Sequence, residues 1–184
     1  TLGYTEEKPL LKDFNFKLEQ GERVFLHGKN GCGKTSFIKA VLSASNKQDY
    51  GIISSGQIST GAGLVISYIN QDTSFLKGNI KEFCTKRGLD ESLFCALLRQ
   101  LDLERVQFVK PFEDYSEGQK KKVLIASSLM TPAHLYIWDE PLNYIDIFTR
   151  MQLEELLLKF NPSMILVEHD IRFQEKIATR VINI

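Results

Sequence analysis

A glycine-rich loop at residues 28–36 constrains the fold more than any other segment of this chain. It reads Gly-Lys-Asn-Gly-Cys-Gly-Lys-Thr-Ser and follows the apolar run 24–26. Glycines let the backbone curl until successive N–H groups converge, and such a cradle binds phosphate oxygens. A strand is expected before the loop and a helix after it, at about residues 34–44, which is the context that this motif requires. We therefore expect a strand–loop–helix unit that binds a nucleoside triphosphate.

Two side chains of this loop have specific chemistry. Lys34 brings a positive charge to the β and γ phosphates, and the hydroxyl of Thr35 is placed to coordinate magnesium. The dipole of the following helix adds to anion binding. The predicted nucleotide-binding residues of the loop are Gly28, Lys29, Asn30, Gly31, Cys32, Gly33, Lys34, Thr35 and Ser36.

Two adjacent carboxylates end the apolar segment that begins at Leu135. Asp139 closes this predicted strand, where a carboxylate can hold magnesium through water. Glu140 follows it and can orient or deprotonate an attacking water. Pro141 fixes the turn after them. The alternative interpretation is a helix cap or a solvated turn, and the phosphate-binding loop upstream favours the magnesium site.

Three further side chains are candidates for nucleotide contacts. His169 follows the apolar run 164–167, at the strand edge where open α/β sheets bind ligands, and we interpret it as a γ-phosphate contact rather than a structural histidine. Gln71 closes another predicted strand and can reach metal or water. Tyr4 could stack on a base, although a surface aromatic near a chain end is the competing interpretation.

Strands and helices alternate along the sequence, which predicts an α/β fold. Continuous apolar strands indicate a parallel sheet covered on both faces. Asp90 is a plausible N-cap for one of the helices. The predicted strands are 14–18, 24–26, 57–60, 64–69, 135–139, 163–168 and 180–184. The predicted helices are about 34–44, 79–85, 90–102, 116–130, 146–160 and 170–178. We expect one domain, with a core at about 1–71 and 116–184 and a helical insertion at about 72–115.

Composition adds limits on partners and location. Lys plus Arg and Asp plus Glu both number 23, so no bulk charge favours nucleic acid or a membrane surface. No apolar run reaches the roughly 18 residues of a membrane span. The three cysteines lack metal-site spacing and indicate reduced thiols in a cytosol. The N-terminus lacks Met, and we expect the chain to be a piece of a longer protein.

A Ser-Glu-Gly-Gln segment at 116–119 completes a set of motifs that together resemble the ATP-binding cassette (ABC) superfamily. In this resemblance residues 28–36 are the Walker A loop and 116–119 are the signature. The remaining matches are Tyr4 at the adenine-stacking position, Gln71 at the Q-loop, Asp139 and Glu140 at Walker B, Asp146 at the D-loop and His169 at the switch histidine. The family usually has glycine where this chain has Glu117, so the signature departs from the family pattern at this position.

The resemblance implies a P-loop NTPase (RecA-like) core with a mostly parallel sheet, an antiparallel β edge and a short helical subdomain. It also implies ATP hydrolysis with ATP and Mg²⁺, with full activity only when a second cassette pairs head to tail. Glu140, His169 and Gln71 would be catalytic, and Thr35, Gln71 and Asp139 would hold the metal. Ser116, Gly118 and Gln119 would contact the ATP of the other cassette.

The closer resemblance is to the ABC-F branch. The insertion at 72–115 is short, the stretch 138–146 looks like the ABC-F sequence after Walker B, and 116–123 with 167–170 is similar to the second cassette of antibiotic-resistance, ribosome-protecting members. This resemblance implies the C-terminal cassette of a cytoplasmic two-cassette protein, with the ribosome as partner and no membrane insertion. The isolated domain would be a monomer or a weak dimer. The alternatives are the nucleotide-binding subunit of an ABC membrane transporter and a regulatory cassette that barely hydrolyses ATP.

Three consecutive lysines, Lys120–Lys122, follow the signature. They could contact rRNA phosphate. The interpretation that we favour is a solvated helix face.

Overall fold

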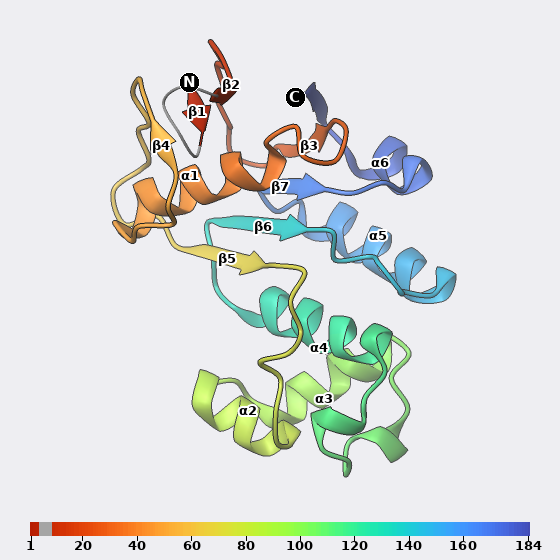
Figure 1. Cartoon of the computed structure of the whole chain (residues 1–184). Coiled ribbons are helices and arrows are strands. Elements are labelled where there is room, and N and C mark those ends of the chain that lie inside the picture. Colours follow the sequence, from red (N-terminus) through yellow and green to blue (C-terminus); the bar gives the residue numbers. More distant parts are fainter. Residues whose placement is uncertain (4–8) are drawn as a thin grey trace. The chain divides into compact units, whose positions relative to one another are not determined.

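The computed structural model describes residues 1–3 and 9–184 (Figure 1). The predicted base-stacking residue Tyr4 lies outside the described residues. The chain divides into two compact units. The sheet unit comprises residues 1–67, 133–139 and 162–184, and the helical unit comprises residues 68–132 and 140–161.

A parallel β-sheet forms the centre of the sheet unit. Its strand order is β5-β6-β7-β3-β8, and the edge strand β5 (Ile66–Ile69) begins in the sheet unit and ends in the helical unit. The other strands are β6 (Leu135–Asp139), β7 (Met164–Val167), β3 (Arg23–His27) and β8 (Arg180–Asn183). All four residues of β7 are buried, as expected for an inner strand of a parallel sheet. The predicted α/β fold is confirmed.

Two helices and a small second sheet complete this unit. Helix α1 (Lys34–Asn46) follows β3, and α6 (Ile171–Ile177) packs on β3 with the ring of Phe173 6.1 Å from that of Phe25. Strands β1 (Leu2–Gly3), β2 (Pro9–Leu11) and β4 (Ile53–Ser54) form an antiparallel sheet in the order β2-β1-β4. The predicted antiparallel β edge is therefore present.

Two of the predicted strands are wrong. Residues 14–18 and 57–60 belong to no strand, and the strand of the second region is β4 instead. The apolar alternation at 14–18 has another cause, because Phe14 and Phe16 pack their rings on Phe37 of α1, at centroid distances of 5.3 and 4.8 Å. Alternation shows which side chains face an apolar neighbour, and here that neighbour is a helix.

The helical unit contains α2 (Ile80–Arg87), α3 (Glu91–Gln100), α4 (Glu117–Met130), α5 (Ile147–Phe160) and the short 3₁₀ turns Arg105–Gln107 and Phe112–Asp114. An aromatic chain of Phe94, Phe83, Phe112 and Tyr115 forms its core, with ring centroids 5.3–5.7 Å apart. The predicted N-cap Asp90 accepts a hydrogen bond from the Leu93 amide at 2.8 Å, so this cap is confirmed. Within the described ranges, every helix is too short or too polar to span a bilayer.

Candidate functional site

The first turn of α1 differs from that of every other α-helix in the described chain. The other five begin at a residue whose side chain accepts a hydrogen bond from a first-turn amide; these caps are Asn79, Asp90, Ser116, Asp146 and Asp170. Helix α1 begins at Gly33, in a left-handed conformation with φ 113°, and has no side-chain cap. Uncapped first-turn amides together with the helix dipole form an anion site. The predicted phosphate-binding loop therefore ends at a helix terminus whose first-turn amides have no side-chain cap.

The ammonium group of Lys34 holds the loop in its curled form. Its Nζ donates hydrogen bonds to the carbonyl oxygens of Gly28 at 2.7 Å and Lys29 at 3.0 Å, and the residue is only 7% exposed. A Cβ at position 28 would lie 2.5 Å from the carbonyl oxygen of Ile184, so only glycine fits there. The positive charge is thus fixed at the loop before a ligand arrives. A phosphate oxygen can replace the loop carbonyls as the acceptor of hydrogen bonds from Lys34.

Two oxygen ligands for a hard cation meet at the end of β6. The hydroxyl of Thr35 donates to Oδ2 of Asp139 at 3.2 Å, and Asp139 is 2% exposed. Mg²⁺ prefers oxygen ligands, keeps several waters and takes one or two groups from the protein. A threonine hydroxyl and a carboxylate at this separation fit that requirement. Thr35 and Asp139 are far apart in sequence, and the prediction of a magnesium site requires their side chains to lie close together, as they do here.

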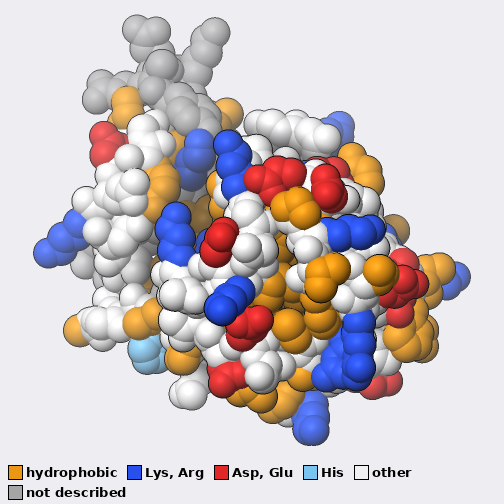
Figure 2. Space-filling view, turned by 90° about the horizontal axis from the view of Figure 1, so that it is seen from below, with side chains coloured by type: hydrophobic (Ala, Val, Ile, Leu, Met, Phe, Trp, Pro, Cys, Tyr) orange, Lys and Arg blue, Asp and Glu red, His pale blue; other side chains and the backbone are white. Residues whose placement is uncertain are grey.

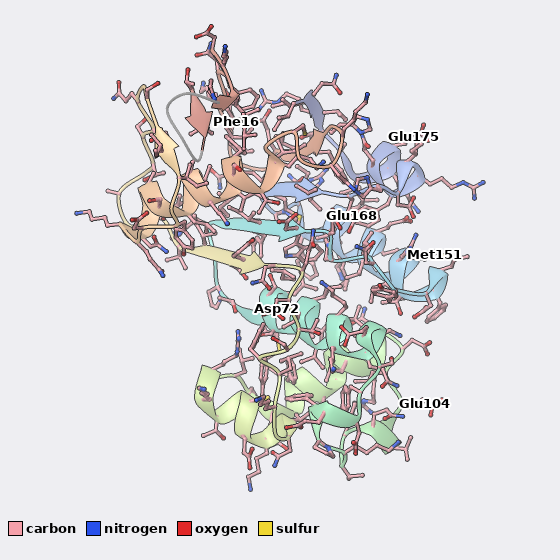
Figure 3. The ribbon with its side chains drawn as sticks, in the orientation of Figure 1. Phe16, Asp72, Glu104, Met151, Glu168 and Glu175 are labelled. Atoms are coloured by element: carbon pink, nitrogen blue, oxygen red, sulfur yellow. The ribbon has the colours of Figure 1, made fainter. Side chains whose placement is uncertain are left out.

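The predicted switch histidine lies at the same edge of the sheet. Asp139 pairs in register with Val167, and Glu168 and His169 directly follow this last residue of β7. Glu168, labelled in Figure 3, is buried and its Oε2 accepts a hydrogen bond from the His169 amide at 3.2 Å, while His169 is exposed. Strands β3, β6 and β7 are parallel, so the loop, Asp139 and His169 all follow carboxyl ends of neighbouring strands.

Glu140 is the first residue of the helical unit after β6, and its backbone is strained. Its φ is +53°, a left-handed conformation that is costly for a residue with a Cβ. Its Oε2 accepts a hydrogen bond from Nδ2 of Asn143 at 3.0 Å. The turn and this hydrogen bond fix the direction of the carboxylate. Sequence reasoning missed Asn143, and its only signal was a side-chain amide three residues after Glu140.

The helical unit carries the other predicted motifs. Gln71 is exposed just after β5, and its carbonyl oxygen accepts a hydrogen bond from Nζ of Lys121 at 3.1 Å. The signature forms a capping box at the start of α4, in which Ser116 Oγ accepts from the Gln119 amide at 3.3 Å and Gln119 Oε1 accepts from the Ser116 amide at 3.0 Å. The Ser116 hydroxyl keeps its own hydrogen for donation to an external acceptor.

Gly118 is required by close packing. A Cβ at this position would lie 2.5 Å from the carbonyl oxygen of Tyr144, so the segment that links Glu140 to α5 can pack against α4 only where no side chain intervenes. The predicted signature and the predicted D-loop segment are therefore neighbours within one unit.

Asp146, the predicted D-loop residue, caps α5 and forms an ion pair with α4. Its Oδ2 lies 2.8 Å from Nζ of Lys122, and its Oδ1 accepts from the Thr149 amide at 2.8 Å. Burial favours the protonated form, but the hydrogen bonds from Lys122 and Thr149 outweigh it and lower the pKa of Asp146 to about 2. This carboxylate stays ionised under all ordinary conditions.

This ion pair predicts an acid-sensitive contribution to stability. Because the pKa of Asp146 is lower in the folded state, its contribution is complete above the unfolded pKa and is lost as pH falls from about 4 to 2. We expect Asp146→Asn, which can still cap α5, to lower the free energy of unfolding by about 1 kcal/mol at pH 6, after allowance for solvent screening. The deficit should shrink towards pH 3. Urea unfolding at both pH values measures it.

The exposed Glu104 of the same unit, labelled in Figure 3, provides the control. Glu104→Gln should change the free energy of unfolding by no more than about 0.5 kcal/mol. A deficit for Asp146→Asn that is the same at pH 6 and pH 3 would contradict the assigned charge interaction.

A family model and several known proteins match this sequence. The family model described as ABC transporter matches residues 11–143. The ATP-binding protein Uup of Caulobacter vibrioides is 30% identical over 185 residues, which cover 96% of this chain and 29% of that protein. The ribosome protection protein VmlR of Bacillus subtilis is 28% identical over 176 residues, which cover 92% of this chain and 30% of that protein. The chain spans about 30% of the length of these relatives.

Solved structures share the fold. An archaeal ribosome recycling factor, aABCE1, in complex with the ribosomal stalk protein aP1 superposes with a TM-score of 0.71 at 24% identity, covering 90% of this chain and 32% of that chain. An RNase-L inhibitor superposes with a TM-score of 0.70, also at 24% identity, with the same coverage. These neighbours confirm the P-loop NTPase fold. Since the family model matches well over half of the sequence, the chain belongs to the ABC transporter family, and it is a cassette of the ABC-F-like, Uup type.

Proposed function

We propose that this chain is the C-terminal, ATP-hydrolysing cassette of a cytoplasmic two-cassette ABC-F protein that acts on the ribosome and confers antibiotic resistance. Membership in the ABC family implies ATP binding and ATP hydrolysis. The observation that carries the proposal is the combination of the uncapped start of α1, the fixed ammonium of Lys34 and the contact between Thr35 and Asp139. These are the parts that phosphoryl transfer requires.

Each residue has a role in this proposal. Lys34 and the loop amides bind the phosphates, and Thr35 binds Mg²⁺ with help from Asp139 and Gln71. The bound Mg²⁺ would neutralise charge on the β and γ phosphates. Glu140 orients the attacking water and accepts its proton, and the hydrogen bond from Asn143 keeps the carboxylate in place. The ring of His169 contacts the γ-phosphate, and Tyr4 stacks on adenine.

The signature serves the nucleotide of a second cassette. The hydroxyl of Ser116 and the Gly118 amide would contact an anion at the start of a 14-residue helix, in the unit that does not contain the chain's own phosphate-binding loop. Gln119 would contact the same anion through its side-chain amide, because its backbone amide already donates to Ser116 Oγ. We infer that each ATP is bound between two cassettes, and that Asp146 lies near this contact. Full ATPase activity then requires both cassettes, and the isolated chain is a monomer or a weak dimer.

The proposal of a ribosomal role rests on similar proteins and not on the charge of the chain. The formal net charge is zero, and basic and acidic side chains interleave on the face seen in Figure 2. A ribosome protection protein is among the similar proteins, and an archaeal ribosome recycling factor shares the fold. We infer that binding to the ribosome depends on the closed, ATP-bound pair of cassettes.

Co-sedimentation tests the ribosomal role. The full-length parent protein with Glu140→Gln should pellet with ribosomes when ATP is present and remain in the supernatant without ATP. Pelleting that is independent of ATP, or no pelleting despite ATP binding measured by calorimetry, would contradict the proposal. A parent that pellets should then raise the drug concentration needed to stop growth, and a protein that pellets without this effect would retain the ribosomal role and lose the resistance role.

The nucleotide-binding subunit of a membrane transporter is the second candidate, because the matching family model is described as ABC transporter. It predicts that the parent protein copurifies with a membrane-embedded partner. The short insertion leaves little room for a groove that would receive a coupling helix. Washed membranes that retain the parent protein while ribosomes do not would favour this candidate.

A further inference from the structure

The three lysines after the signature are bound to specific partners. Lys120 pairs with Glu117 at 3.0 Å, and Lys122 pairs with Asp146 at 2.8 Å. Lys121 donates hydrogen bonds to the carbonyl oxygens of Asn70 at 3.3 Å and Gln71 at 3.1 Å. The interpretation of this run as a solvated helix face is wrong for Lys121 and Lys122, which are 3% and 6% exposed.

Burial of the Lys121 ammonium is unusual because an apolar side chain of similar size would fill the same space at a lower desolvation cost. The charge is retained against two backbone carbonyls at the end of β5, where the chain leaves the sheet. Those carbonyls belong to the segment that presents Gln71. The contact therefore fixes the position of this segment on α4.

A second contact fixes the same segment two residues later. The hydroxyl of Thr73, which is 6% exposed, donates to Oε2 of Glu117 at 2.7 Å. The hydrogen bond from Thr73, followed by that from Lys120, lowers the pKa of Glu117, so its carboxylate is ionised. Positions 117 and 121 are four residues apart on α4 and lie on one face. Asp72, labelled in Figure 3, is in the segment between the two contacts.

We propose that Glu117 and Lys121 form a two-point clamp that couples Gln71 to the signature helix, and that both are positioning residues for ATP hydrolysis. The clamp rests on the proposed function, in which Gln71 serves the chain's own nucleotide and Ser116 serves that of the second cassette. A displacement of Gln71 on nucleotide binding would then move the start of α4, because both are held together within one unit. The clamp also accounts for Glu117 at a position where the family usually has glycine. Its carboxylate is engaged by Thr73 and Lys120.

The clamp predicts a separation of turnover from binding. In the full-length parent, Lys121→Met should lower kcat about tenfold or more and change the Kd for ATP less than about twofold. Thr73→Val, which removes the hydroxyl at nearly constant side-chain volume, should also lower kcat. Lys121→Arg keeps the charge and should recover part of the lost rate. Lys81→Met, an exposed lysine on α2, is the matched control and should match the wild type.

Hydrogen exchange provides a readout that does not depend on hydrolysis. The amides of Ser74 and Leu76 are hydrogen-bonded to Asp72 and Thr73, within the clamped segment. In nucleotide-free Lys121→Met, the peptide covering residues 70–76 should exchange faster, by about tenfold, because loss of the clamp favours local opening. The same peptide should be unaffected in Lys81→Met.

Three results separate the clamp from its alternatives. Unchanged kcat and unchanged exchange in Lys121→Met would overturn the clamp. Parallel losses of kcat, ATP affinity and thermal midpoint would also overturn it, because they indicate a merely structural residue. If the wild type hydrolyses ATP no faster than Glu140→Gln, the proposed function fails, and exchange of the segment alone decides whether the clamp exists.

Discussion

ATP turnover by the full-length parent protein is expected to fall about 100-fold or more when Glu140 is replaced by Gln, because a positioned general base contributes about 10²–10⁴ to a rate. The amide has the shape of the carboxylate but cannot accept the proton of the attacking water. The Kd for ATP should change little, since no phosphate contact is removed. Single-turnover hydrolysis together with calorimetry measures both quantities.

The control for this substitution is Glu175→Gln, which makes the same chemical change on α6 at the exposed carboxylate labelled in Figure 3. It should leave turnover unchanged. Wild-type rates in Glu140→Gln would remove Glu140 from its assigned role. A loss of ATP binding equal to the loss of turnover would instead mean that the residue supports the site rather than the chemistry.

The second large effect is expected at Lys34. Replacement by Ala should raise the Kd for ATP about tenfold to 100-fold, because a hydrogen bond to a charged group contributes about 1.5–3 kcal/mol. The carbonyls of Gly28 and Lys29 also lose the donor that holds the loop in its curled form. Calorimetric titration of the nucleotide measures the change.

Lys34→Met removes the charge while keeping a side chain of similar size, and it should weaken ATP binding to a similar degree. Lys77→Met removes a positive charge from an exposed position in the helical unit and should bind ATP like the wild type. Equal affinities for the wild type and Lys34→Ala would disprove the phosphate-binding role of this loop.

The sequence predicted most of the elements because their signals are local. A side chain that can cap a helix, as at Asp90 and Ser116, acts within one turn, and both helices begin where these residues predict. The signal for β6 and β7 is also local, because each of these buried strands is a continuous apolar run. The segment 14–18 misled the prediction because its apolar residues pack on Phe37, and alternation alone does not identify the partner.

The candidate site was assigned from motifs, whereas the contacts within it could not be predicted from the sequence. Thr35 and Asp139 were assigned to magnesium separately, and only the fold shows that their oxygen atoms lie 3.2 Å apart. The burial of Lys121 could not be predicted, because its acceptors are backbone carbonyls, which every residue has and no sequence distinguishes. The hydrogen bond between Thr73 and Glu117 depends on how the segment after β5 packs against α4, and no local sequence signal links the two positions.

The left-handed backbone at Glu140 creates a trade-off between folding stability and ATPase activity at one position. Glycine adopts this conformation without the penalty of about 1–2 kcal/mol that a Cβ incurs. A selection for thermal resistance alone would therefore favour glycine at residue 140 and discard the carboxylate that we assign to hydrolysis. Libraries screened for heat tolerance should accumulate cassettes that bind ATP and no longer turn it over, unless activity is selected in the same round.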